Sequence, residues 1–228
     1  MDFVGIDKFS LLDYDENVSV VLFAPKCNFR CPFCHNGDSV LNSDTPIKFE
    51  SILSYLKTRQ RLVDAVVITG GEPTLMPDLV EKISEIRKLG FKIKLDTNGT
   101  NPELLSYLIE NNYLDYVAMD IKNSEQEYPK TAGCQVVNMD KIKESIEILM
   151  SSNIPYEFRT TLVKEFHSEE SIRGVGELVR NAQKLYLQKF VDREGVIQRG
   201  LNPIEQDEAL KFKNILEDYV FMCELRGY

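Results

Sequence analysis

The chain contains no long hydrophobic run. None of its apolar stretches approaches the roughly 20 residues that span a bilayer, and residues 1–7 show neither the basic start nor the apolar stretch of a signal peptide. We therefore expect a cytoplasmic protein with no membrane partner. Its 228 residues, 43% of them hydrophobic, are enough to bury a sizeable core, so we expect a single domain over residues 1–228.

An excess of basic residues is also missing. The 27 Lys and Arg residues are outnumbered by 36 Asp and Glu residues, which gives a formal net charge of -9. Because phosphate contacts need clustered Lys and Arg, this charge argues against a nucleic-acid partner. Local basic groups at residues 57–61 and 82–94 fall mostly on segments of helical period, where we expect solvated helix faces.

The five cysteines form no pattern of pairs. Cys134 and Cys223 stand alone, so we expect neither a disulfide framework nor a second metal cluster. We interpret these two as small buried apolar residues or free surface thiols. The other three, Cys27, Cys31 and Cys34, share a C-x3-C-x2-C spacing. Such clustered thiolates are soft ligands that suit an iron-sulfur cluster or zinc, and they predict sensitivity to oxygen.

Two kinds of metal centre could use these three thiolates. A structural zinc site could take His35 as its fourth ligand, but Cys34 and His35 are adjacent, and neighbouring side chains rarely converge on one metal. Zinc ribbons usually supply a second ligand pair downstream, and this chain has no such pair. An iron-sulfur cube held by three cysteines instead leaves one iron open for a substrate. The sequence favours the iron-sulfur cube.

Apolar, β-branched runs alternate with segments of helical period along the chain. The expected strands span residues 18–24, 65–69, 91–96, 116–120, 156–162 and 184–190. Expected helices begin at Pro77 and Pro102, a third carries Ile142 and Ile146 on one face, and the last covers residues 205–220 with no strand after it. This alternation indicates an α/β fold with a parallel sheet. An open doubly wound sheet and a barrel are both compatible with the spacing, but polar motifs after four successive strands favour a barrel.

Glycines and carboxylates follow several of these strands. Gly70, Gly71 and Glu72 come after the second strand, where glycine allows the backbone to approach a ligand closely. Asp96 and Asp120 end strands that should be buried, where an unpaired carboxylate is costly. For the two aspartates, a buried ion pair is the alternative to a ligand site.

Two further polar positions have a structural alternative. Arg159 lies within the fifth strand, where a buried arginine needs an anionic partner. An ordinary turn explains Asn98-Gly99, because both residue types tolerate left-handed backbone conformations.

Four motifs, in this order, resemble the signature of radical S-adenosylmethionine enzymes. They are Cys27-Asn28-Phe29-Arg30-Cys31-Pro32-Phe33-Cys34-His35-Asn36, Thr69-Gly70-Gly71-Glu72-Pro73-Thr74-Leu75, Lys94-Leu95-Asp96-Thr97-Asn98-Gly99 and Tyr116-Val117-Ala118-Met119-Asp120-Ile121-Lys122. The aromatic residue before the third cysteine is typical of the superfamily, and the His-Asn after it is typical of the branch that activates glycyl-radical enzymes. Within that branch the chain is most similar to the activating proteins of anaerobic ribonucleoside-triphosphate reductases. The resemblance implies an open partial TIM barrel of about six βα units, whose side opening would admit part of another macromolecule.

The resemblance also implies the cofactors and the residues that hold them. A 4Fe-4S cluster would be held by Cys27, Cys31 and Cys34, and its open iron would bind S-adenosyl-L-methionine, which one electron cleaves to a 5'-deoxyadenosyl radical. The residues implied to contact this cofactor are Phe33, Gly70, Gly71, Glu72, Asp96, Asn98, Lys122 and Arg159. Asp96 and Asp120 are implied to hold a monovalent cation beside it. Phe33 and Arg159 have structural alternatives, as an aromatic that caps the core and as a brace within the strand.

The chain departs from some of these enzymes in its histidines. Some relatives place a histidine near the sixth strand for the cofactor, whereas this chain has only His35 and His167. His167 follows the fifth strand, and we expect it to be a solvated loop residue.

The function implied is the abstraction of hydrogen from a backbone glycine of an anaerobic ribonucleotide reductase, with flavodoxin or ferredoxin as the electron donor. Alternatives within the same chemistry are activation of another glycyl-radical enzyme of the formate-lyase type, and conversion of a small molecule, as by 7-carboxy-7-deazaguanine synthase. An electron-transfer iron-sulfur protein is an alternative of a different class. It would need no cofactor pocket, so Gly70, Gly71, Glu72 and Asp96 argue against it.

Overall fold

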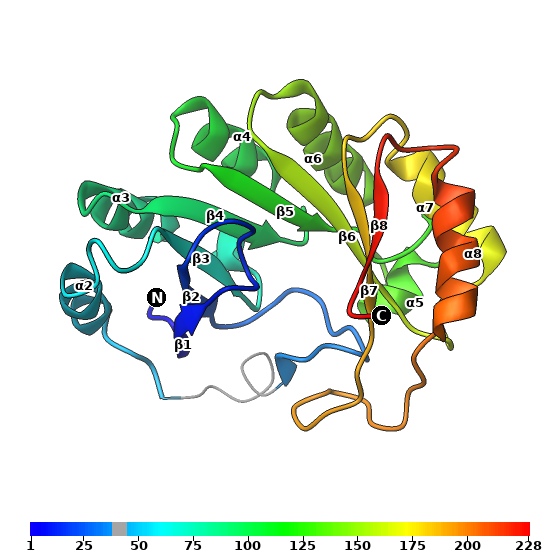
Figure 1. The fold of residues 1–228 in the computed structure, drawn as a ribbon, viewed down its shortest axis with the longest axis horizontal. Coiled ribbons are helices and arrows are strands. Elements are labelled where there is room, and N and C mark those ends of the chain that lie inside the picture. The colour runs from blue at the N-terminus through cyan, green and yellow to red at the C-terminus, as the bar shows by residue number, and fades with distance from the viewer. Residues whose placement is uncertain (38–44) are drawn as a thin grey trace.

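The structure is a computed structural model that describes residues 1–37 and 45–228 (Figure 1). Within these ranges eight strands form one sheet in chain order. They are β1 (Gly5–Ser10), β2 (Ser19–Ala24), β3 (Ala65–Gly70), β4 (Lys92–Thr97), β5 (Tyr116–Asp120), β6 (Tyr156–Leu162), β7 (Leu185–Lys189) and β8 (Cys223–Arg226). Strand β1 is antiparallel to β2, and each later strand is parallel to the one before it. The sheet is an open α/β sheet of the partial TIM barrel type, because β1 and β8 remain its two edges.

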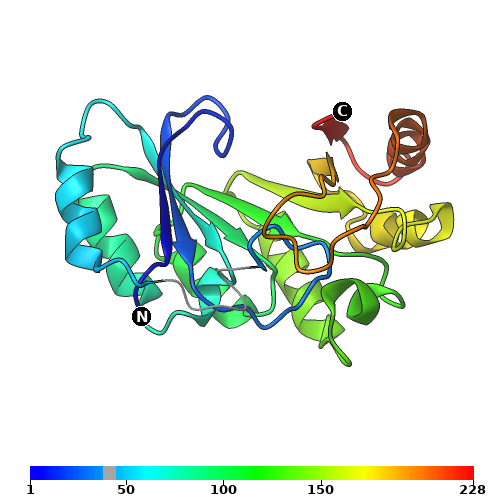
Figure 2. The ribbon, with the colours of Figure 1, turned by 90° about the horizontal axis from the view of Figure 1, so that it is seen from below.

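Every crossover between parallel strands carries a helix. The helices are α2 (Phe49–Lys57), α3 (Leu79–Lys88), α4 (Pro102–Glu110), α5 (Tyr128–Ala132), α6 (Met139–Ser151), α7 (Glu169–Leu178) and α8 (Gln206–Leu216), with a 3-10 turn η1 (Pro73–Leu75). The longer helices lie along the outer, convex side of the curved sheet, and its concave side carries loops in place of helices (Figure 2). The six crossovers confirm the expected number of βα units.

The central strands are buried on both faces because their sequences are almost continuously apolar. In β2 and β3, Val20 and Val66 are register partners and belong to the core under the helices. Their neighbours Val21 and Val67 point to the concave face, where they pack with Tyr14 in a second, smaller cluster. Side chains alternate between the two faces of a strand, so one apolar run supplies both clusters.

The six expected strands are confirmed within one residue at every end, but two strands were missed. Strand β1 and strand β8 are the edges of the sheet, and β8 contradicts the expectation that no strand follows the last helix. Both have exposed polar residues in place of a clean apolar run, so their pattern carries little strand signal. Helix α8 also ends at Leu216, earlier than expected.

The loop between β1 and β2 folds over the concave face of the sheet. Lys94 Nζ of β4 donates to the Asp13 carbonyl at 2.5 Å, and the Tyr14 and Tyr116 rings lie 5.4 Å apart. Asp15 Oδ2 lies 3.7 Å from the Arg226 guanidinium of β8. The loop therefore reaches from one edge of the open sheet to the other.

In the ranges that the structure describes, no helix is both long and apolar enough to cross a membrane.

Candidate functional site

A cavity of about 530 Å³ lies at the C-terminal ends of the parallel strands. Every residue that the sequence analysis assigned to the cluster, the cofactor or the cation lines its wall. These residues are Cys27, Cys31, Phe33, Cys34, Gly70, Gly71, Glu72, Asp96, Asn98, Asp120, Lys122 and Arg159. The cavity also extends to Asp7 of β1 and Asp13 of the following loop, so it reaches one open edge of the sheet. Four segments far apart in sequence meet here because parallel strands end at the same rim.

The three cysteines stand on a loop that directly follows β2. The Phe29 amide donates to Cys27 Sγ at 3.3 Å, and the Cys34 amide donates to the Cys31 carbonyl at 3.0 Å. Cys31 is buried, whereas Cys27 and Cys34 are partly exposed. The loop turns so that all three thiols face one cavity.

Segments far downstream in the sequence hold this cysteine loop in place. The Arg30 amide donates to the Ala132 carbonyl at 2.9 Å, and the Gln198 amide donates to the Pro32 carbonyl at 2.8 Å. The His35 ring is 2.8 Å from the Val191 carbonyl through Nε2 and stacks on Phe190. These anchors were not predicted from the sequence, because a sequence pattern does not show which distant segments the cysteine loop will contact.

The two glycines after β3 allow the cysteine loop to cross close to the sheet. A Cβ on Gly71 would lie 1.7 Å from the Lys26 carbonyl oxygen, and Gly70 has a φ of +105°. The Glu72 amide donates to that same Lys26 carbonyl at 2.8 Å. Only glycine permits this approach, so the pair shapes the start of the cysteine loop.

Glu72 is a buried carboxylate that joins the ends of β3 and β4. Its oxygens accept hydrogen bonds from Thr74 N at 3.1 Å, Thr97 Oγ1 at 2.7 Å and Asn98 N at 2.7 Å. Burial raises the pKa of Glu72, and these donors act in the opposite direction. Its carboxylate is thus engaged with the protein itself, and it fixes the backbone of the Asn98 turn.

A small polar cluster connects the Asn98 turn to the cysteine loop. Asn98 Nδ2 donates to Asn28 Oδ1 at 2.8 Å, and Asn28 Nδ2 donates to Thr100 Oγ1 at 2.8 Å. Asn98 Nδ2 also lies 3.9 Å from Cys27 Sγ. Sequence reasoning missed Asn28, although it lies inside the cysteine motif. Only the tertiary structure shows which of the motif's polar side chains points toward β4.

Four charged side chains form the opposite wall. Arg159 donates to Asp120 Oδ1 through Nε at 2.9 Å and to Asp96 Oδ2 through Nη1 at 3.2 Å, and Lys122 Nζ donates to Asp120 Oδ2 at 2.9 Å. Burial opposes the ionisation of Asp120, but Arg159 and Lys122 nevertheless hold its pKa at about 2. The Arg159 guanidinium pairs with both carboxylates that were expected to hold a cation, so the monovalent cation stays a prediction.

One atom of this wall has no donor. Asp96 Oδ1 is buried, and no donor among the described residues reaches it within hydrogen-bond distance. A buried oxygen without a donor is costly, so a ligand group in the cavity that donates to Asp96 would be stabilised there.

Buried aromatic side chains pack beside the residues of the site. The Phe33 ring lies 5.9 Å from Phe166, and Phe33 is buried in the core while also lining the cavity. Tyr128, which sequence reasoning missed, is fully buried, and its hydroxyl donates to the Asp120 carbonyl at 3.3 Å.

His167 is not the solvated loop residue that we expected. It is 5% exposed, its Nδ1 accepts from the Val163 amide at 3.1 Å, and its Nε2 lies 3.1 Å from the Lys122 carbonyl. Burial lowers the pKa of His167, which favours the neutral ring. The residue braces the backbone behind Lys122 and does not line the cavity.

The described residues present no ready-made site for a single metal ion. Among residues 1–37 and 45–228, no three His, Cys, Asp or Glu side chains converge closely enough to hold one metal ion. Burial raises the pKa of Cys27 to about 11 and that of Cys31 to about 12. These thiols are therefore protonated in the metal-free protein, and binding of a metal cluster would displace their protons.

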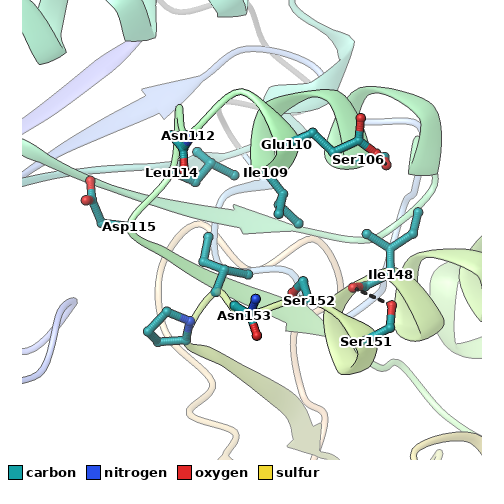
Figure 3. Close-up of a pocket in the computed structure, with 12 residues that line it drawn as sticks. Ser106, Ile109, Glu110, Asn112, Leu114, Asp115, Ile148, Ser151, Ser152 and Asn153 are labelled. Atoms are coloured by element: carbon teal, nitrogen blue, oxygen red, sulfur yellow. Dashed lines mark hydrogen bonds between the residues drawn. The ribbon is translucent and has the colours of Figure 1, made fainter.

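A second cavity, of about 600 Å³, lies at the opposite ends of the strands (Figure 3). It is formed by the C-terminal ends of α4 and α6 and by the segments that lead into β5 and β6, including Glu110 and Asn153. Barrel enzymes place their chemistry at the C-terminal ends of the strands, and residues at the other end serve stability. We therefore assign the site to the smaller cavity.

The chain is similar in sequence to known proteins. A family model described as the radical SAM superfamily matches residues 21–175. A proposed glycyl-radical enzyme activating enzyme of Methanocaldococcus jannaschii is 35% identical over 222 residues, which cover 95% of this chain and 92% of that protein. A proposed GTP 3',8-cyclase of Pyrococcus abyssi is 28% identical over 162 residues, which cover 70% of this chain but only 51% of the cyclase.

The chain is similar in fold to solved structures of other proteins. A radical SAM methyltransferase from Sphaerobacter thermophilus has a TM-score of 0.73 at 12% identity, over 94% of this chain and 68% of that chain. SuiB of Streptococcus suis bound to S-adenosylmethionine has a TM-score of 0.68 at 14% identity, over 91% of this chain and 52% of SuiB. At these identities the likeness concerns the fold alone.

Proposed function

The chain belongs to the radical SAM superfamily, and we propose that within it the chain is an activating enzyme that installs a glycyl radical on a partner protein. The observation that carries this proposal is the similarity to the Methanocaldococcus jannaschii protein, which spans 95% of this chain and 92% of that relative. The four motifs point within this class to an anaerobic ribonucleoside-triphosphate reductase as the partner. Flavodoxin or ferredoxin as electron donor, a cytoplasmic location and a single domain are parts of the same proposal.

Members of this superfamily use a 4Fe-4S cluster and S-adenosyl-L-methionine, and the residues of the cavity fit both. Three thiols face the cavity, and three cysteines are one ligand fewer than such a cluster can take, which suits a cluster that keeps one iron for a cofactor. When bound, the two groups supply reductive cleavage to a 5'-deoxyadenosyl radical, which removes a hydrogen atom from the substrate. We assign the cluster to Cys27, Cys31 and Cys34.

The remaining walls would bind and orient the cofactor. Lys122 and Arg159 bring positive charge to the cavity, which suits the carboxylate of an amino acid. Asp96 Oδ1 offers an unused acceptor, and the backbone at Gly70 and Gly71 can approach the ligand closely. Phe33 offers an apolar surface beside the thiols, and Asn98 and Glu72 hold the rim of the cavity.

The open sheet supports a protein as the substrate. The cavity reaches Asp7 and Asp13 at the β1 edge, and β8 is the other edge of the same sheet. A segment of a partner chain could therefore reach the cavity from the β1 edge without unfolding of the sheet. A closed barrel of eight units would have no such side entrance.

The proposal is tested by anaerobic reconstitution of the cluster, followed by reduction with dithionite in the presence of S-adenosyl-L-methionine. We expect 5'-deoxyadenosine, and with an anaerobic ribonucleotide reductase from the same organism we expect a glycyl radical by electron paramagnetic resonance. A reductase whose radical-site glycine is replaced by alanine is the matched control and should give no such signal.

Each alternative predicts a different outcome. A glycyl radical that forms only on a formate-lyase type enzyme would change the partner but keep the class. Cleavage of the cofactor without a radical on any glycyl-radical enzyme would favour a small-molecule substrate. If S-adenosyl-L-methionine neither bound nor was cleaved, the electron-transfer alternative would replace the proposal.

A further inference from the structure

A line of charged side chains crosses the concave face from the candidate cavity to the open edges of the sheet. Successive members lie between 2.9 and 3.9 Å apart, and their charges alternate in sign. This ion-pair line consists, in order, of Lys122, Asp120, Arg159, Asp96, Lys94, Glu157, Arg226 and Asp15. The first four members line the cavity and the last four do not.

Glu157 is the most buried member of the line. Its side chain is 1% exposed, and it lies on the same face of β6 as Arg159, two residues away. The Arg226 guanidinium donates to both of its oxygens at 3.2 and 3.3 Å, and the Tyr116 hydroxyl donates to it at 3.2 Å. Burial opposes the charge of Glu157, so these partners are what make a carboxylate tolerable at this position.

Lys94 is shared between two carboxylates. Its ammonium lies 3.8 Å from Glu157 Oε1 and 3.9 Å from Asp96 Oδ1, and it donates to the Asp13 carbonyl. Asp96 Oδ1 is the same buried oxygen that no donor reaches within hydrogen-bond distance in the described part of the chain. The ammonium is therefore held just outside hydrogen-bond contact with this buried oxygen of the cavity wall.

We propose that Glu157 is a positioning residue for cofactor binding, because its charge holds Lys94 away from Asp96 and leaves Asp96 Oδ1 free for a donor of S-adenosyl-L-methionine. Without the Glu157 charge, Asp96 becomes the nearest carboxylate to Lys94, and the attraction between them increases in this buried setting. Lys94 then moves onto Asp96 Oδ1 and competes with the ligand. The inference rests on the proposed role of Asp96 at the cofactor site and is independent of which protein is activated.

The test compares affinities for S-adenosyl-L-methionine, measured by calorimetry on cluster-reconstituted protein. Glu157→Gln keeps the shape of the side chain and removes its charge, and we expect the dissociation constant to rise roughly tenfold, as for the loss of one hydrogen bond to a charged group. Lys94→Met in the same chain removes the competing ammonium, so the double variant should regain most of the affinity. Glu224→Gln is the matched control, because Glu224 pairs with Lys213 outside the ion-pair line. We expect no change in its affinity.

The recovery in the double variant separates positioning from mere support of the fold. Unchanged affinity in Glu157→Gln overturns the proposal, and so does an equal loss in the single and double variants. The melting temperature without ligand is recorded for each variant, since a loss of affinity that follows stability alone also overturns it. If Glu157→Gln does not fold, Glu157→Asp with and without Lys94→Met takes its place, and equal affinities of that pair overturn it. Failure to form a glycyl radical would leave these outcomes unaffected.

Discussion

Cys31 and Cys134 carry the same functional group in different surroundings. Cys31 is buried at the cavity with two other thiols, whereas Cys134 Sγ lies 3.5 Å from the Asn28 carbonyl behind the cysteine loop. Proximity to the loop therefore does not make Cys134 a ligand. The thiols that we assign as cluster ligands are those that face a shared cavity.

Replacement of single cysteines tests this assignment. Cys31→Ala should abolish cluster incorporation, because two thiolates do not hold a four-iron cube in place, and cofactor cleavage should be lost with it. Cys134→Ala should leave the iron and sulfide content of the reconstituted protein unchanged. Retention of the cluster in Cys31→Ala, or its loss in Cys134→Ala, would refute the ligand set.

Some residues of the site were identified from the sequence, and others were missed. Asp96 and Arg159 were identifiable from the sequence, because a charge in a buried strand must have a partner. Asn28 and Glu157 were not identified, since an exposed-looking amide in a loop and a glutamate at the start of a strand fit many surroundings. Their roles follow from the partners that the fold brings to them: Asn98 for Asn28, and Lys94 with Arg226 for Glu157.

At the scale of single elements, the turn after β3 supports the cysteine loop. Gly71→Ala would place a Cβ 1.7 Å from the Lys26 carbonyl oxygen, so the start of the cysteine loop would have to move. We expect iron incorporation to fall to near background while far-ultraviolet circular dichroism stays close to that of the parent. Gly90→Ala is the control for backbone strain alone, because Gly90 has a φ of +91° but a Cβ there meets nothing within 4 Å, so it should lower stability and leave the iron content unchanged. Normal iron content in Gly71→Ala would show that the loop tolerates the displacement.

The segment between β6 and α7 should make stability depend on pH through His167. Burial holds the pKa of His167 below its ordinary value of 6.5, so the unfolded chain takes up the proton first as the pH falls. The unfolded state then binds more protons, and this part of the stability is complete above pH 6.5 and lost below it. We expect the free energy of unfolding in urea to fall less in His167→Asn than in the parent between about pH 7.5 and about pH 5.5. Parallel curves for the two metal-free proteins would contradict this account.

At the scale of the whole molecule, the open sheet brings its two edges together through Arg226. The guanidinium contacts Glu157, whose side chain is 1% exposed, and Asp15, whose side chain is 66% exposed. The first contact is buried and forms two hydrogen bonds, whereas the second is screened by solvent. The inner contact therefore fixes Arg226 to β6 within the sheet, and only the weak outer contact links β8 to the loop after β1.

Two substitutions measure this difference. Arg226→Gln should lower the free energy of unfolding by about 2–3 kcal/mol, because Glu157 loses its charged hydrogen-bond donors. Asp15→Asn should lower it by less than about 1 kcal/mol, as is usual for an exposed ion pair. Urea unfolding of the metal-free protein provides both values. A larger effect from Asp15→Asn would mean that the exposed contact contributes more to stability than the buried one.

The fold was predictable in its centre and not at its edges. The apolar runs of β2 to β7 specify buried parallel strands, and the helix signals between them specify the crossovers. Strand β8 pairs along β7 with the sequence Cys-Glu-Leu-Arg, and half-exposed polar residues carry no period that separates strand from loop. Edge strands therefore depend on the neighbour that they pair with more than on their own sequence.

By itself, the sequence determined the chemistry of this protein. Ligand type and order are properties of the chain, so the clustered thiols predicted a metal centre, and the resemblance of the four ordered motifs to radical SAM enzymes predicted its chemistry. The tertiary structure alone decided which residues meet: that Glu72 holds the Asn98 turn, that His167 is buried behind Lys122, and that Lys94 stands between Glu157 and Asp96. The physical reason is that these contacts join strands and loops far apart in the chain, and their strength depends on burial and distance, which only the fold sets.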